Sequence, residues 1–480
     1  MWLRDPGLRK LNFLIFLMFS TGASTGYVGS LINGLQVLPF FTIFTQNLSP
    51  STIGLMIASG AIGSFVSYIP ASYIADTLGR KKCVGIGSTI VIITSLFQGV
   101  FPNRWVFMST RLVAGIGSGI AAAAAPLLVT EIAHPHTRQS ATAIYNTTWC
   151  MGSITSAVVT ILTLNIASSW SWRLPCLLQM VYPSLQIISL MFVPESPRWL
   201  VSAGRKSEAL CILRKYHSNG NEHDEIVQKE FDQICSLIPL NSKSATHGWK
   251  KFFSCRGSMH MLGICIMVGF MQEWAGNGVI SYYLAPILTS VGVTKVRDQA
   301  VVNIGMQIWN LIVSALGGLA SEKYGRRTLW LLSTMLMILF LALVTIVTGL
   351  YKEQGLSAAG VAAVPLLFLF FGAFDIAYGS LFIAYPVEIL PFHLRAKGLA
   401  TTLLSDSVAA FSNQYVNPVA FSSIGWKYYC VFLGCLSFFL LIIYFFFPET
   451  KGKSLEEISE SFMSKHQADT SSEKQQPEKC

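Results

Sequence analysis

The stretch "DTLGRKK", residues 76–82, recurs as "EKYGRRT" at residues 322–328, and each copy follows a long apolar run. Two more pairs of segments repeat in the same order, and they are "EIAHPHTR" (131–138) with "EILPFHLR" (388–395), and "PESPRWL" (194–200) with "PETKGKSL" (448–455). Within each pair the offset is close to half of the chain. Ordered matches at nearly one offset indicate an internal duplication, so the sequence predicts two related halves.

The composition is that of a protein with many membrane spans. Of the 480 residues, 52% are apolar and 12% are charged, whereas about 25% are charged in a typical soluble domain. About 20 helical residues cross a bilayer, and lipid admits only helices and closed barrels. Long apolar runs without polar alternation favour helices. We predict an all-α membrane protein with twelve transmembrane helices, at about 11–37, 53–74, 83–102, 105–130, 140–165, 174–193, 259–290, 299–320, 328–350, 360–384, 398–421 and 427–447.

Basic residues predict the orientation of these spans. The net charge is +10, and its distribution along the chain matters more than its total. By the positive-inside rule the basic connections and both termini are cytoplasmic, so we expect a multi-pass membrane protein without a nucleic-acid partner. The basic connections carry Arg80, Lys81, Lys82, Arg138, Arg198, Arg205, Lys206, Arg326, Arg327, Arg395 and Lys397, and the opposite ones Arg104, Arg173, Lys295, Arg297, Lys352 and Lys427.

The duplication and the polar segments predict four parts. Residues 1–195 and 259–447 are expected to form two six-helix bundles, joined by a cytoplasmic loop with short helices at 196–258 and followed by a cytoplasmic tail at 448–480. The ten cysteines are scattered without a CxxC pair, which indicates packing residues and no metal framework. The spans lack a set of nucleophile and base, and the chain lacks a GxxxxGK[ST] phosphate loop. We therefore expect neither an enzyme nor a cofactor.

Two related bundles are the plan of a secondary transporter, in which the bundles rock around a site near the membrane midplane. The charged residues of the repeated loops then have a mechanism. Ion pairs between the bundles at the cytoplasmic face would hold the outward-open state closed on that side. The alternative is that the basic residues only orient the helices, but carboxylates contribute little to orientation. The predicted cytoplasmic gate consists of Arg80, Glu131, Arg138, Glu322, Arg326, Glu388 and Arg395.

The repeated motifs resemble those of the sugar porter branch of the major facilitator superfamily. "GRR", "PESPRWL", "PVEILPFHLRAKG" and "PETKGKSLEEI" occur in the order expected for that family, from about residue 20 to residue 455. The wording "YNTTWCMGSI", "WSWRLPCLLQ" and "NQYVNP" is similar to fungal transporters of the lactose-permease-like and hexose groups. The resemblance implies a carrier that moves a mono- or disaccharide by alternating access. This carrier is expected to be a monomer in the lipid of the plasma membrane.

Amide and aromatic side chains in the C-terminal half are the candidates for binding this sugar. A sugar presents hydroxyl groups, so a site in a low-dielectric region needs matching polar groups. The family resemblance supports Gln272, Asn303, Asn413 and Asn417 separately. The alternative is that these amides form hydrogen bonds between helices. The predicted set is Gln272, Asn277, Tyr282, Tyr283, Asn303, Asn413 and Asn417, with Gln307 and Asn310 on the same span as Asn303.

The segment "TGYVGSLINGL" bears on energy coupling. Proton-coupled members of the family usually have an aspartate where this chain has Val28, opposite an arginine that is present here as Arg111. Facilitated diffusion is therefore slightly favoured over proton symport. An intramembrane arginine is costly unless it is paired or faces water, so Arg111 needs another environment.

Three intramembrane carboxyl groups keep symport open. Glu273 stands where the family commonly has a second glutamine, and one hypothesis is that it has taken over proton coupling. Asp375, in "FDIA", and Asp406 are further candidates, with a gating or structural role favoured for Asp375. Rival interpretations are a sugar sensor, which usually has a longer cytoplasmic tail, and an inactive homologue.

Overall fold

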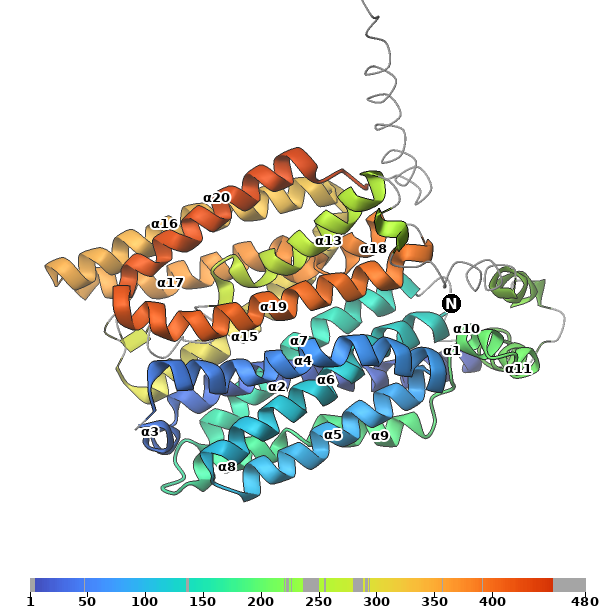
Figure 1. Ribbon diagram of the computed structural model, residues 1–480, viewed down its shortest axis with the longest axis horizontal. Helices are drawn as coiled ribbons and strands as arrows, with labels where there is room; N and C mark the ends of the chain where they lie inside the picture. Colours follow the sequence, from blue (N-terminus) through green and yellow to red (C-terminus); the bar gives the residue numbers. More distant parts are fainter. Residues whose placement is uncertain are drawn as a thin grey trace, which may run out of the picture.

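The computed structural model of the chain is helical in all the regular structure that it describes (Figure 1). The described residues are 5–46, 48–134, 138–219, 221, 224–225, 227–235, 250–253, 256–278, 288–289, 292, 294–355, 357–390 and 392–451. The helices are α1 (Pro6–Met18), α2 (Ser20–Val37), α3 (Pro39–Thr45), α4 (Pro50–Leu78), α5 (Arg80–Val100), α6 (Arg104–Ile132), α7 (Arg138–Thr163), α8 (Trp170–Leu178), α9 (Val181–Leu190), α10 (Pro197–Ser202), α11 (Lys206–His217), η1 (Lys250–Phe253), α13 (Arg256–Trp274), α15 (Val296–Tyr324), α16 (Arg326–Gln354), α17 (Ser357–Phe374), η2 (Asp375–Gly379), α18 (Ala384–Ile389), α19 (Phe392–Ile424), η3 (Gly425–Tyr428) and α20 (Tyr429–Phe446).

The long helices run along the longest axis of the molecule, with α3 at one end and α10 and α11 beyond the other (Figure 1). We call these ends the α3 face and the α11 face. Eight helical stretches in the described ranges are long and apolar enough to cross a membrane unaided. The predicted all-α fold with twelve crossings is confirmed, and the crossings are α1 with α2, α4, α5, α6, α7, α8 with α9, α13, α15, α16, α17 with η2 and α18, α19, and α20.

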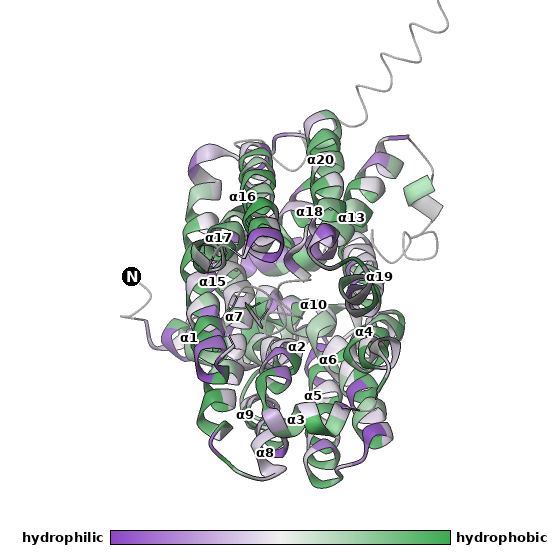
Figure 2. Cartoon of the chain, turned by 90° about the vertical axis from the view of Figure 1, so that its left-hand side faces the viewer, coloured by the Kyte–Doolittle hydropathy of each residue, from purple (hydrophilic) through white to green (hydrophobic). Residues whose placement is uncertain are grey.

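Each half of the chain packs around its own buried side chains. The N-terminal clusters draw on residues between Leu11 and Tyr216, and the main C-terminal cluster on residues between Phe252 and Phe447. The halves meet where α4 packs along α19 and α7 along α15, and Figure 2 shows these four helices between the two sets. The four predicted segment boundaries stay a prediction, because the tail beyond Lys451 lies outside the described residues.

The outer surface of the helices is apolar, as lipid requires. Phe16, Ile346 and Phe445 are 62%, 57% and 71% exposed, and Figure 2 shows hydrophobic residues along the outward sides of both halves. Soluble monomers rarely expose apolar surface on this scale. These helices thus place apolar side chains on their outer sides, where a soluble helix has polar ones. Many polar side chains lie in the interior.

Two glycines let α2 and α7 approach closely inside the N-terminal half. A Cβ atom on Gly26 would overlap the carbonyl of Trp149, and one on Gly152 would overlap the carbonyl of Ala23 and lie 2.8 Å from Tyr27 N. Backbone cannot give way as the end of a flexible side chain can. The contact of α2 with α7 therefore depends on the absence of side chains at these positions.

We expect Gly152→Val to lower the melting temperature of the purified protein in detergent. Overpacking a tight contact costs about 1–3 kcal/mol, and here the added atoms meet backbone. Gly434→Val on α20 is the matched control, because a Cβ atom there has nothing within 4 Å. Equal melting temperatures for the two variants would contradict this packing argument.

Candidate functional site

The repeated segments meet in a polar network at the α11 face, once in each half. Gly79 and Gly325 end α4 and α15 with φ of 99° and 93°, values that glycine adopts without strain. The next helix then begins under a carboxylate. Glu195 accepts a hydrogen bond from Lys81 N at 3.1 Å, and Glu449 accepts one from Arg326 N at 2.8 Å. Negative charge is favourable at a helix N-terminus, so each glutamate stabilises the start of its helix.

Ion pairs complete the two networks. Arg80 Nε lies 3.3 Å from Glu131 Oε2, and Arg326 Nη2 lies 2.9 Å from Glu388 Oε1. A hydroxyl group also donates to each of these acids, from Ser196 to Glu131 and from Thr450 to Glu388. In each half, the segments at 131–138 or 388–395 and at 194–200 or 448–455 thus supply the partners of the first repeated segment, at 76–82 or 322–328. The duplication seen in the sequence is therefore also a duplication of contacts.

These ion pairs differ from the predicted gate in what they join. The sequence predicted pairs between the bundles in the outward-open state, and these stay a prediction. In this structure Arg80–Glu131 and Arg326–Glu388 each connect helices of one half. The physical reason is local, because each acid lies next to the helix start that its own half supplies. The side chains of the other three predicted gate residues, Arg138, Glu322 and Arg395, lie outside the described residues.

At the α3 face the two halves are held together by apolar side chains. Val37 at the end of α2 is buried with Ala300 of α15, and Ile161 of α7 and Val296 of α15 pack against them. This contact is apolar and brings the two halves together at that end. Together with ion pairs that stay within each half at the α11 face, it describes a carrier closed on the α3 side.

A polar contact joins the halves below this closure. Ser153 of α7 donates a hydrogen bond to Gln307 Oε1 of α15 at 2.7 Å, and both residues are buried. Gln307 Nε2 in turn donates to Oδ1 of Asn303, a predicted sugar ligand, at 3.5 Å. Asn303 therefore lies at the boundary between the halves, where a site for alternating access is expected.

Asp375 is held by its own half. It begins the π-helical turn η2, a distortion that often marks functional sites. With the Asn310 amide assigned so that its nitrogen faces the two acceptors, this nitrogen donates to Asp375 Oδ2 and to Met306 O, both at 3.0 Å. The thiol of Cys150 on α7 lies within electrostatic range of the carboxyl group. Asp375 thus has a polar partner within its own half, and the structural or gating role expected for it stays a prediction.

Predicted sugar ligands on α13 and α19 lie together and retain unused polar atoms. Asn413 Nδ2 donates to the backbone oxygen of Glu273, and Asn417 Oδ1 accepts from the hydroxyl of Tyr428 at 2.9 Å. Among the described residues no hydrogen-bond partner reaches four buried atoms here: Gln272 Oε1, Glu273 Oε2, Asn413 Oδ1 and Asn417 Nδ2. Buried polar groups are rarely left unpaired, so this cluster is a candidate ligand site.

The seventh span breaks beside this cluster. α13 ends at Trp274, and Gly276 has φ of 93°, whereas the sequence predicted one span from 259 to 290. Discontinuous helices often line transporter sites because they free backbone groups. Asn277 follows the break and is half-buried. The predicted ligands Tyr282 and Tyr283 lie outside the described residues.

Asp406 adds a second carboxyl group next to the cluster. It lies on α19 within electrostatic range of Glu273, and a Cβ atom on Gly269 of α13 would lie 2.8 Å from Asp406 N. Asp406 Oδ1 has no hydrogen-bond partner among the described residues. From the other half, Tyr68 of α4 lies within electrostatic range of Asp406 and close to Ser407.

Arg111 lies in a different part of the molecule from these acids. It is buried on α6 in the N-terminal half, where a Cβ atom on Gly60 of α4 would be 3.5 Å from its Nη2. Its guanidinium also lies within electrostatic range of the thiol of Cys176 on α8. Val28 on α2 is half-buried. The predicted proton-coupling residues thus occupy three separate sites, one each for Arg111, Asp375 and Glu273.

Two residues of the boundary escaped prediction. Ser153 is one of many small polar residues in its span, and its role depends on a partner more than 150 positions away. Tyr68 has no distinguishing neighbour in the sequence. Spacing on one helix predicts which residues share a face, but it does not show which helix that face meets.

The fold and the site define a class: a two-bundle membrane carrier with a polar site between its halves. A model of the family described as "Sugar (and other) transporter" matches residues 13–462, so the chain belongs to that family, within the major facilitator superfamily.

Individual relatives and solved structures agree with this assignment. The chain is 28% identical to "MFS-type transporter oryC" of Aspergillus oryzae, over 95% of this chain and 86% of the relative. It is 27% identical to "Hexose transporter HXT11" of Saccharomyces cerevisiae, over 92% and 80%. The proton:xylose symporter XylE bound to 6-bromo-6-deoxy-D-glucose has a TM-score of 0.78 at 22% identity, over 95% and 99% of the two chains. An inward open conformation of XylE from E. coli has a TM-score of 0.77, also at 22% identity, over 94% and 99%.

We expect Ser153→Ala to weaken the closure at the α3 face. Losing one hydrogen bond worth about 1 kcal/mol shifts a two-state equilibrium roughly fivefold. An Ala300→Cys reporter in a Cys430→Ser background should then react several-fold faster with a membrane-impermeant thiol reagent.

The control is Ser437→Ala, which removes a hydroxyl that bonds only to Leu433 O of its own helix. Unchanged labelling of the Ala300→Cys reporter in Ser153→Ala would mean that the Ser153–Gln307 contact does not hold the halves together.

Proposed function

We propose that this protein carries a mono- or disaccharide across the membrane by alternating access. The observation that carries the proposal is the group of four buried polar atoms on α13 and α19 without partners among the described residues. Hydroxyl groups of a sugar both donate and accept, so one sugar satisfies carbonyl, carboxylate and amide atoms together. The names of relatives such as the hexose transporters of yeast support a sugar as the substrate.

The proposed setting is the plasma membrane, with a monomeric carrier whose α11 face and termini are cytoplasmic. The basic residues of the α11 face support this orientation by the positive-inside rule. In that orientation the apolar contact at Val37 and Ala300 closes the extracellular side. The conformation described is then inward-facing, and the outward-facing one requires this contact to open.

We favour facilitated diffusion as the mode of transport. Val28 cannot bind a proton, so the N-terminal half has no carboxyl group opposite Arg111 at the position that proton-coupled relatives use. Without a coupled ion, a carrier only equalises sugar concentrations. A closed α3 side and a polar boundary serve this mode as well as they serve symport.

One specific observation favours proton symport as a second candidate. Glu273 Oε2 and Asp406 Oδ1 are buried, lie on adjacent helices and have no hydrogen-bond partner among the described residues. Intramembrane carboxyl groups are costly and commonly belong to proton pathways. Glu273 also holds the sugar cluster through Asn413, so a proton and a sugar would share one site.

Uptake into liposomes by the purified protein tests the function and its mode. For a panel of labelled hexoses, pentoses and disaccharides, we expect at least one sugar to equilibrate and none to accumulate, with or without an inward proton gradient. Accumulation only with the gradient would select symport, and loss of that accumulation in Glu273→Gln, with sugar exchange retained, would place coupling at Glu273. Absence of uptake would favour the sensor or the inactive homologue.

The location of the site is tested by Gln272→Ala. We expect roughly fivefold weaker sugar binding, measured by scintillation proximity, because one hydrogen bond worth about 1 kcal/mol is lost. Gln98→Ala on α5 is the matched control, since Gln98 is another buried glutamine but α5 packs only on helices of the N-terminal half. A similar loss of affinity in both variants would move the site away from α13.

A further inference from the structure

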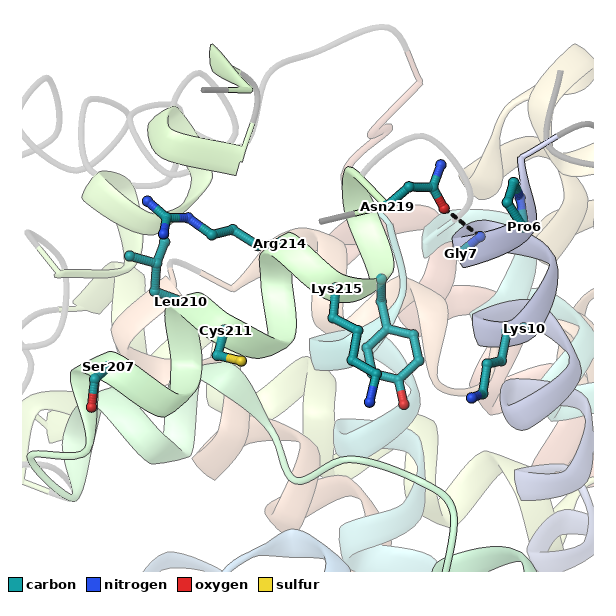
Figure 3. A pocket seen from close by; sticks show the side chains of 10 residues that line it. Pro6, Gly7, Lys10, Ser207, Leu210, Cys211, Arg214, Lys215 and Asn219 are labelled. Carbon is teal, nitrogen blue, oxygen red and sulfur yellow. Dashed lines mark hydrogen bonds between the residues drawn. The ribbon is translucent and has the colours of Figure 1, made fainter. Parts of the chain in front are cut away.

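A basic pocket lies at the α11 face, away from the boundary between the halves. It encloses about 790 Å³ between α1 and α11. Figure 3 shows Lys10 on α1 facing Lys215 on α11, with Asn219 beside Gly7 at the start of α1. Arg214, Ser207 and Tyr216 also line the pocket.

The two walls of the pocket are fixed to each other. Asn219 follows α11 with φ of 53°, a left-handed conformation that asparagine tolerates at the end of a helix. Its Oδ1 accepts a hydrogen bond from Gly7 N at 2.6 Å (Figure 3). Its Nδ2 donates to Asp5 Oδ1, also at 2.6 Å. A Cβ atom on Gly7 would lie 3.1 Å from Tyr216 O. The cationic groups of both helices are thus presented by a preformed frame.

The charges of the pocket favour an anion. Lys10, Arg214 and Lys215 line it, and no acidic residue is among the described residues that do. Among the described residues, two carboxylates adjacent in sequence to lining residues make other contacts. Asp5 accepts from the start of α1 and from Asn219, and Glu208 pairs with Arg205 at 2.6 Å. Lys and Arg bind phosphate oxygens through charge-assisted hydrogen bonds.

The position of Lys10 along α1 indicates a lipid as the source of this anion. Lys10 is the last charged residue before the uncharged stretch from Leu11 to Ala75, which places it at the boundary of water and hydrocarbon. One turn further along the same face of α1, Phe13 is 60% exposed. A phosphate at Lys10 would therefore continue into acyl chains beside Phe13.

We propose that this pocket binds the headgroup of an anionic phospholipid that carries phosphate esters, with Lys10 and Lys215 as the principal contacts. The proposal uses the cytoplasmic orientation of the α11 face, because the anionic lipids of the plasma membrane lie in that leaflet. It does not depend on transport. A bound headgroup would brace α11 against the first span.

The test is binding of phosphatidylinositol 4,5-bisphosphate to the full-length protein in phosphatidylcholine nanodiscs. We expect the variant Lys10→Gln/Lys215→Gln to bind this lipid at least tenfold more weakly. The control Lys229→Gln/Lys352→Gln removes the same charge from exposed sites outside the pocket and should bind as the unchanged protein does. Melting temperatures of all three proteins establish that they are folded.

Competition with soluble compounds distinguishes the possible sources of the phosphate. Inositol 1,4,5-trisphosphate and inorganic phosphate should compete much more weakly than the lipid. If the soluble compounds bind as tightly as the lipid, the site takes a free phosphate ester and the lipid assignment is overturned. Equal weakening in both double variants would reduce the effect to general surface charge and overturn the site. Failure of sugar uptake bears on none of these outcomes.

Discussion

A carboxylate that accepts hydrogen bonds from the start of a helix is the interaction on which the rest of this structure depends. Glu195 does this for α5 and Glu449 for α16. Glu195 thus connects the end of the N-terminal half to the turn between α4 and α5. Glu449 connects the end of the C-terminal half to the turn between α15 and α16. Ion pairs from Arg80 and Arg326 extend the tie to further helices. These contacts hold each half together at the α11 face, so that alternating access would mainly require contacts at the boundary between the halves to change.

The boundary combines few polar contacts with many apolar ones. In a membrane the apolar surfaces of helices gain little by packing against each other instead of lipid, so polar groups and close packing decide the association. Ser153–Gln307 joins the halves directly, while the unpaired atoms near Glu273 remain for a ligand. A sugar bound there would contact one half first and complete its hydrogen bonds as the other half closes. Binding and conformational change then draw on the same polar groups.

Much of this could be predicted from the sequence, and the failures have physical causes. The apolar runs and the repeated segments predicted twelve spans in two halves, because length, composition and order determine them. Partners are a different matter. In this structure Glu131 and Glu388 pair within their own halves, because a repeated motif does not say which of two equivalent copies it meets. Their pairing between the bundles in the outward-open state stays a prediction. The break at Gly276 and the contribution of Tyr68 also depend on tertiary contacts.

Distances between the halves test alternating access most directly. Spin labels at Gln46→Cys and Glu353→Cys report on the α3 face, and labels at Lys82→Cys and Lys323→Cys report on the α11 face, all four positions being exposed. If the two halves move as units, addition of a transported sugar should lengthen the distance between the labels at one face and shorten the distance at the other face. Distances that stay fixed, or that lengthen together at both faces, would contradict a carrier in which two bundles rock about a central polar site.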